Sequence, residues 1–190
     1  VTAKEIINNT NKTINAILQE YLDSPKSIKF LYNEKNSGPS CSRNNGLIVA
    51  KGEYVFFCDS DDWLENTALE LLYDHAKNEK ADFVYCDFFM NYKNEEVYTK
   101  SVPFSSNKKV FTQYYLMNGW PVVWNKLYRR DFLISHNLKF DERFVFCEDL
   151  LFTTSVLNFS TRYSYLNKAL YHYNRCNMKS ITNTLSIDSK

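Results

Sequence analysis

The fold is decided by the stretch Tyr54-Val55-Phe56-Phe57-Cys58-Asp59-Ser60-Asp61-Asp62, in which an apolar run leads into three carboxylates. A short apolar run bounded by polar residues is typical of a buried β-strand. Like charges crowded at its end repel one another, which favours a bound cation. Mg²⁺ commonly takes one or two carboxylates together with phosphate oxygens of a substrate. Open α/β sheets bind ligands at the carboxyl ends of their strands, so the stretch predicts a metal–phosphate site there.

The same carboxylates have two other interpretations. An acidic turn that caps the following helix would have the same composition, and the pattern alone leaves this alternative open. An EF-hand calcium loop would match Asp59, Asp61 and Glu70 at its first, third and twelfth positions. The fifth and sixth positions, however, are Trp63 and Leu64, where such a loop requires an oxygen ligand and a glycine, so a calcium loop is excluded.

The bulk composition indicates a globular protein. The chain has 190 residues, of which 44% are hydrophobic, and its formal net charge is +1. This is long enough for one domain with a core, and nothing in the charge suggests a nucleic-acid partner. The five cysteines include no C-x-x-C pair, which predicts buried thiols in a reducing cytosol rather than a zinc site. No apolar run reaches about 18 residues and no signal peptide is recognisable, so we expect a cytoplasmic protein.

Strand-like and helix-like segments alternate along the first half of the chain. Strands are predicted at 5–7, 28–32, 54–58 and 82–89, and helices at 13–22, 40–50 and from 66 through 76. Alternation of this kind is typical of an α/β fold with a three-layer, mostly parallel sheet. After residue 91 the sequence predicts a hairpin at 92–102, helices at 111–118 and 148–158, and short strands at 162–166 and 169–173. We expect one domain over 1–190, whose second half is an α+β acceptor or lid region.

Two further groups could belong to the site. The segment 36–46 is rich in hydrogen-bond donors and leads into a helix, so Arg43 in its first turn could meet a phosphate or a base. An ordinary surface arginine on a capped helix is the alternative. Glu148 and Asp149 open another helix, where the helix dipole alone would favour acidic residues. Their functional alternative is a general base, since a carboxylate in a partly apolar cleft can accept a proton from an alcohol.

Two more features remain ambiguous in the sequence. The run 124–130 contains Lys126 and two arginines, which could supply cations to a diphosphate or lie on a solvated helix face. His172 alternates out from a strand-like run, where it could be a packed histidine or a metal ligand.

Several motifs follow one another along the chain: Ser42-Arg43-Asn44-Asn45-Gly46, Ala50-Lys51-Gly52-Glu53-Tyr54, Phe57-Cys58-Asp59-Ser60-Asp61-Asp62-Trp63, Trp124-Asn125-Lys126-Leu127-Tyr128, Phe140-Asp141-Glu142 with Glu148-Asp149, and Tyr171-His172-Tyr173 through Ser180-Ile181. In this order they resemble family 2 glycosyltransferases with the GT-A fold. Members usually read A-R-N-x-G, A-x-G-E-Y, F-x-D-S-D-D, N-K-L-Y and E-D at these places. The resemblance spans nearly the whole chain. It implies that residues 1–90 bind a nucleotide-sugar and residues 91–190 the acceptor.

The resemblance also implies a reaction. The family moves a sugar from a nucleotide-sugar, here most simply a UDP-sugar, to a hydroxyl of a saccharide or lipid-linked acceptor, with inversion. Its D-x-D carboxylates hold Mn²⁺ or Mg²⁺ on the donor diphosphate, which corresponds to Asp59 and Asp61, with Asp61 the direct ligand and Asp59 nearer the ribose. Asp62 would act through water. The catalytic base corresponds to Asp149, with Glu148 beside it. Polysaccharide assembly at the inner face of the plasma membrane is the setting expected by analogy.

The nucleotide-sugar contacts implied by the resemblance are Arg43, Asn44 and Lys126, together with Asn8 and Asn9. The last two stand where the family usually has aspartates, and an asparagine carbonyl can still accept a hydrogen bond, but without charge. The family's opening strand, V-S-V-I-I-P-x-Y-N, has no counterpart here, so we expect an N-terminally truncated domain.

Two other functions compete with this interpretation. A sugar-nucleotide nucleotidyltransferase would also need acidic strand ends and Mg²⁺, but it would usually show a glycine-rich phosphate loop, which this sequence lacks. A non-catalytic nucleotide-binding module is the second, because a sheet without its first strand would bind the donor poorly.

Overall fold

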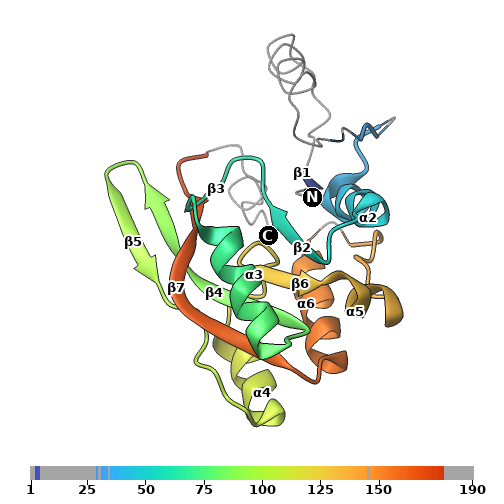
Figure 1. The fold of residues 1–190 in the computed structure, drawn as a ribbon. Helices are drawn as coiled ribbons and strands as arrows, with labels where there is room; N and C mark the ends of the chain where they lie inside the picture. The colour runs from blue at the N-terminus through green and yellow to red at the C-terminus, as the bar shows by residue number, and fades with distance from the viewer. Residues whose placement is uncertain (1–2, 5–28, 30, 34, 145, 178–190) are drawn as a thin grey trace, which may run out of the picture.

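The computed structural model describes residues 3, 4, 29, 31–33, 35–144 and 146–177 (Figure 1). Its strands are β1 (Ala3–Lys4), β2 (Tyr54–Cys58), β3 (Trp63–Leu64), β4 (Phe83–Tyr92), β5 (Glu95–Thr99), β6 (Lys126–Arg129) and β7 (Tyr163–Asn174). Its helices are α2 (Gly38–Val49), α3 (Ala68–Glu79), α4 (Lys108–Asn118), α5 (Arg130–Ser135) and α6 (Glu148–Phe159). The strands form one sheet in the order β1-β2-β6-β4-β7-β3, and β5 pairs with β4.

Helices cover both faces of this sheet, which confirms the expected three layers. Figure 1 shows α3 in front of the sheet and α6 behind it. Successive residues of β2 point to opposite faces, as strand geometry requires. Phe56 therefore packs into the core under α3 with Leu72, while Phe57 packs into the core under α6 with Phe140 and Phe152. Burial on both faces explains why 54–58 is a continuous apolar run.

The strand directions are more mixed than expected. Within the described chain, β1–β2 and β4–β7 are parallel, whereas β2–β6, β4–β6, β3–β7 and β4–β5 are antiparallel. The prediction of a mostly parallel sheet is therefore wrong for these strands, although the α/β class is confirmed. Two of the four antiparallel pairs involve β6, a short strand that lies between β2 and β4. It lies in the run 124–130, for which the sequence had suggested either a solvated helix face or a cation source.

Most predicted elements are present. The helices expected near 40–50, 66–76, 111–118 and 148–158 and the strands at 54–58 and 82–89 are confirmed as α2, α3, α4, α6, β2 and β4. The two short strands near 162–173 are one long strand, β7, with a register shift opposite Cys86–Phe88. Lys29, Leu31 and Tyr32 do not belong to a strand, so the expected strand at 28–32 is not found at these positions. The elements expected at 5–7 and 13–22 lie outside the described residues.

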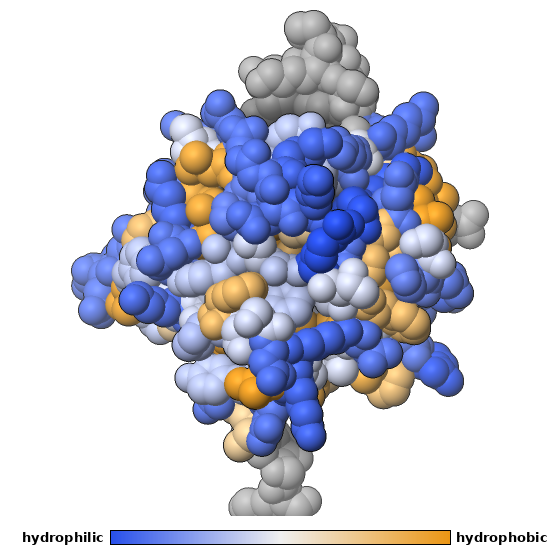
Figure 2. Space-filling model, turned by 60° about the horizontal axis from the view of Figure 1, so that its bottom comes forward, coloured by the Kyte–Doolittle hydropathy of each residue, from blue (hydrophilic) through white to orange (hydrophobic). Residues whose placement is uncertain are grey.

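Hydrophilic side chains predominate on the face of the molecule seen in Figure 2, and hydrophobic ones form separate groups there. In the part of the chain that the structure describes, no helix is both long and apolar enough to cross a membrane.

Candidate active site

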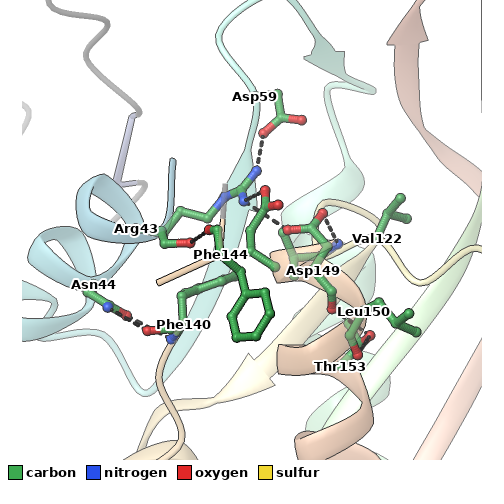
Figure 3. Close-up of polar contacts among 12 residues, drawn as sticks. Arg43, Asn44, Asp59, Val122, Phe140, Phe144, Asp149, Leu150 and Thr153 are labelled. Atoms are coloured by element: carbon green, nitrogen blue, oxygen red, sulfur yellow. Dashed lines mark hydrogen bonds and ion pairs between the residues drawn. The ribbon is translucent and has the colours of Figure 1, made fainter. Parts of the chain in front are cut away.

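Arg43, from α2, lies among carboxylates that come from the end of β2 and from the start of α6 (Figure 3). Its Nη1 donates to Asp149 Oδ1 over 2.8 Å and to Glu148 Oε1 over 3.0 Å, both in the first turn of α6. Its Nη2 donates to Asp59 Oδ1, just after β2, over 3.1 Å. The arginine side chain is only 8% exposed. The surface-arginine alternative is therefore wrong, and the structure brings three predicted acidic site residues together around one guanidinium.

Asp149 is held by two donors at the start of α6. Its Oδ1 accepts from Arg43, and its Oδ2 accepts a hydrogen bond from the backbone N–H of Val123 over 3.3 Å. Burial raises the pKa of Asp149 to about 7, against the lowering effect of Arg43 and with a further rise from the Glu148 and Asp59 charges. A carboxyl group with this pKa can hold or release a proton near neutral pH, which is what a general base requires.

The start of α6 is shaped to present the two acids. Cys147, which precedes the helix, has φ 63° and ψ 16°, a left-handed conformation that non-glycine residues rarely adopt. Such outliers cluster at functional sites because the surrounding structure must hold them. The helix dipole favours acidic residues at this terminus, which was the alternative explanation for Glu148 and Asp149 in the sequence. Their contacts with Arg43 add a role that the dipole does not explain.

Asn44 is turned away from the carboxylates that Arg43 binds and towards Phe140 (Figure 3). Its Nδ2 donates to Phe140 O over 2.9 Å and to Glu142 Oε1 over 2.8 Å, and its Oδ1 accepts from Phe140 N over 2.9 Å. The expected contact of Asn44 with the nucleotide is thus not supported. Instead Asn44 fixes the segment whose Phe140 ring lies 5.3 Å from the Arg43 guanidinium carbon, a cation–π distance.

Lys126 is buried, with an exposed fraction of 2%. Its Nζ donates to Val122 O and to Asn125 Oδ1, each over 2.6 Å, and lies 5.4 Å from the centre of the Tyr115 ring. Burial lowers the pKa of Lys126 to about 7, and the Asp149 charge opposes this shift. The prediction that Lys126 meets the donor diphosphate does not fit this position. It holds the 122–125 loop, from which Val123 binds Asp149.

The three carboxylates after β2 face three different partners. Asp59 meets Arg43, and Asp61 Oδ2 accepts from Asn177 Nδ2 over 2.7 Å. Asp62 is bound on both oxygens by residues of β7. Burial raises the pKa of Asp62 to about 7, although these hydrogen bonds act to lower it.

The alternative that the acidic turn caps the following helix is wrong. Helix α3 begins at Ala68 and, in the described structure, no side chain caps it.

A divalent ion fits Asp59 and Asp61 only as part of a larger ligand set. Across the described ranges, no three or more His, Cys, Asp or Glu side chains converge as a metal site would require. Asp59 Oδ2 and Asp61 Oδ1, however, have no hydrogen-bond partner among the described residues. Two hard carboxylate oxygens suit Mg²⁺ or Mn²⁺, which take their remaining ligands from water or substrate phosphates. The chemistry of these two oxygens therefore suits a metal that takes its other ligands from a diphosphate.

His172 is a packed histidine. Its ring stacks on Trp63 at 5.0 Å and on Phe89 at 4.8 Å, and 7% of the residue is exposed. Its two ring nitrogens face different carboxylates, Glu65 at 3.1 Å and Glu96 at 3.2 Å. Because these contacts diverge, the metal-ligand alternative is not supported.

Sequence reasoning missed the residues that hold the acidic turn: Tyr171, Asn174 and Asn177 bind it from β7 and the residues that follow β7. The motif position of Tyr171 was the only sequence signal for this group, and it said nothing about which atoms it meets. Asn8 and Asn9 lie outside the described residues, so their nucleotide contacts stay a prediction.

Comparison with known proteins identifies the family. The family described as Glycosyl transferase family 2 matches residues 6–138, a range that includes Arg43, Asp59 and Asp61 but ends before Asp149. The cholesterol galactosyltransferase of Borreliella burgdorferi is 31% identical over 185 residues, which are 90% of this chain and 51% of that protein. The poly(ribitol-phosphate) β-N-acetylglucosaminyltransferase TarP of Staphylococcus aureus is 31% identical over 160 residues, 83% of this chain and 47% of that one.

A solved structure gives the same result for the fold. The crystal structure of Staphylococcus aureus TarS 1–349 in complex with UDP-GlcNAc superposes with a TM-score of 0.70 at 25% identity, covering 88% of this chain and 47% of that chain. The chain thus spans about half the length of the relatives it matches. The sequence resemblance is confirmed: this chain belongs to glycosyl transferase family 2 and has the GT-A fold.

Proposed function

We propose that the chain provides the catalytic centre of an inverting, metal-dependent glycosyltransferase that moves a sugar from a UDP-sugar to an acceptor hydroxyl. The single observation that supports this best is the Arg43 bridge, which joins Asp59 on the donor side to Asp149 on the acceptor side. The TarS structure with UDP-GlcNAc supports a UDP-sugar as the donor. The acceptor is a saccharide or a lipid-linked saccharide.

The charge balance of the cluster supports a bound cation. One guanidinium meets Asp59, Glu148 and Asp149, and Asp61 lies two residues from Asp59, so negative charge is in excess. Asp59 and Asp61 would hold Mn²⁺ or Mg²⁺, whose chemistry is to neutralise the charge that grows on a departing diphosphate. Two unit charges 4 Å apart near a protein surface interact by about 4 kcal/mol, or roughly three decades of rate if expressed only in the transition state.

Asp149 is the proposed base. Its carboxylate accepts the proton of the acceptor hydroxyl, and the hydroxyl oxygen forms a bond to the anomeric carbon. The bond from that carbon to the diphosphate oxygen breaks on the opposite face, and its electron pair leaves with the nucleoside diphosphate. General base catalysis of this kind typically contributes about 10²–10⁴-fold. Val123 N–H and Arg43 hold the carboxylate in place, and the pKa of about 7 lets it accept a proton near neutral pH.

The test is donor turnover by the whole chain. UDP release from a set of UDP-sugars is measured with Mn²⁺, for the natural sequence and for Asp149→Asn. We expect metal-dependent release from one donor and a loss of about 10²–10⁴-fold in Asp149→Asn. Asp74→Asn is the matched control, because Asp74 is an exposed residue of α3, and it should retain full activity. Tight UDP binding without turnover of any donor would favour a non-catalytic nucleotide-binding module.

A further inference from the structure

The hydroxyl of Tyr171, together with Asn174 and Asn177, ties the acidic turn 59–62 to β7 and the residues that follow it. Tyr171 Oη accepts a hydrogen bond from the backbone N–H of Asp59 over 3.2 Å and donates to Asp62 Oδ2 over 2.5 Å. The tyrosine is fully buried, and its ring stacks on Trp124 at 4.5 Å with an interplanar angle of 16°. Packing therefore fixes the position of the hydroxyl, which binds both ends of the turn.

Both carboxylate oxygens of Asp62 accept hydrogen bonds from residues of β7. Its Oδ2 accepts from Tyr171, and its Oδ1 accepts from the backbone N–H of Asn174 over 2.8 Å. Asp62 N in turn donates to Asp59 O over 3.2 Å, which closes a four-residue turn around Asp61. Asp61 is thus held between two anchored residues, while both oxygens of Asp62 are engaged with β7.

We propose that Tyr171 is a positioning residue for the metal–diphosphate site: its hydroxyl sets the direction of Asp59 and Asp61, with Asp62 as its anchor rather than a third ligand. This inference rests on the proposed function. A tyrosine that only packs would affect the stability of the fold, whereas a positioning tyrosine affects how much metal the site needs. Loss of the hydroxyl leaves the Asp59 N–H and one Asp62 oxygen without their buried partner, so the turn can relax.

The test is calorimetric titration of the whole chain with UDP at a series of Mn²⁺ concentrations. We expect Tyr171→Phe to raise the Mn²⁺ concentration for half-maximal UDP binding about tenfold, the effect of losing one or two hydrogen bonds. Tyr163→Phe is the matched control. It lies on the same strand and loses a hydrogen bond of the same kind, from its hydroxyl to Ser105 O over 2.7 Å, so its Mn²⁺ requirement should stay unchanged.

Asp62→Ala is the second variant, and it also decides the question if Tyr171→Phe does not fold. Alanine removes the carboxylate that accepts from Tyr171, so we expect the Mn²⁺ requirement to rise in this variant too. The effect in the double variant should be smaller than the product of the two single effects, because both changes remove the hydrogen bond between Tyr171 and Asp62. A lowered melting temperature with an unchanged Mn²⁺ requirement, or effects that multiply in the double variant, would overturn the inference. If the natural sequence itself shows no metal-dependent UDP binding, the proposed function fails and the inference with it. If that binding is present but unaffected in Tyr171→Phe, only the inference fails.

Discussion

Arg43 Nη1 lies 2.8 Å from Asp149 Oδ1, although 106 residues separate them in the chain. The same guanidinium meets Asp59 through its other terminal nitrogen. The proposed base and the first proposed metal ligand are therefore held at opposite sides of one cation. Because Arg43 contacts both the end of β2 and the start of α6, loss of its guanidinium should affect both halves of the site.

Replacement of Arg43 by methionine should damage both stability and function. It leaves three half-buried carboxylates without their shared cation, which we expect to lower the free energy of unfolding by about 3 kcal/mol. Urea unfolding measures this change. Arg143→Met is the control, because Arg143 forms an exposed ion pair with Asp141 and is itself 84% exposed. It should leave the free energy of unfolding unchanged, and an equal loss in both variants would contradict the central role given to Arg43.

The rate of transfer should depend on the ionisation of Asp149. Because the pKa of Asp149 is raised to about 7 and the base acts as a carboxylate, kcat should rise about tenfold per pH unit below 7 and level off above it. A pH–rate profile at saturating donor and Mn²⁺ measures this. A rate that is already constant from pH 5 upwards would show that the carboxylate ionises at its ordinary pKa or that another group is the base.

The free energy of unfolding should also depend on the ionisation of Asp149. The part that Asp149 contributes should fall with rising pH in the range where kcat rises. Since the pKa of Asp149 is higher in the folded protein than its ordinary value of 3.8, the folded state binds more protons between about pH 4 and pH 7. Stability from this group is therefore present at low pH and is lost as the pH rises to about 7. The amide introduced by Asp149→Asn cannot ionise, so the free energy of unfolding of this variant, relative to the natural protein, should increase across this window. A difference that stays constant with pH would contradict the assigned shift.

Lys126→Met tests whether the buried lysine supports the base or meets the donor. Methionine has similar length and no charge, and replacing a buried cation by an apolar residue is often neutral for stability. We expect UDP binding with Mn²⁺ to stay unchanged, because Lys126 is 2% exposed and bonded to its own loop. The rise of kcat should move to higher pH, since a positive charge near Asp149 is lost. Loss of UDP binding by a folded variant would instead support the prediction from the motif that Lys126 contacts the donor diphosphate.

The parts of the site that the sequence predicted are those determined locally. The apolar run 54–58, followed by charged residues, is a local signal for a buried strand and for the point where it ends. Glu148 and Asp149 open a helix because the helix dipole favours acidic residues there. The meeting of these residues at Arg43 was not predicted, because distances across the sheet cannot be read from the local periodicity of the sequence. The sequence thus predicted the elements that carry the acidic residues, but neither the burial of Lys126 and Asn44 nor the contacts of Tyr171.

The failures have one physical cause, which is tertiary contact between distant segments. Lys126 resembles a solvent-exposed cation in sequence, yet β6 becomes the strand between β2 and β4 and buries it. Asn44 resembles a nucleotide contact, but its amide binds the backbone of Phe140, 96 residues away. Tyr171 and Asp62 are 109 residues apart. Since pairs like these depend on how the layers stack, no window along the chain could have predicted them.

UDP binding by calorimetry in the presence of Mn²⁺, compared between Asp61→Ala and Asp149→Asn, tests the division of the site into a donor side and an acceptor side most directly. We predict that Asp61→Ala loses metal-dependent UDP binding, whereas Asp149→Asn binds UDP as the natural sequence does and fails only in transfer. An equal loss of UDP binding in both variants, or none in Asp61→Ala, would contradict the roles assigned to these two aspartates.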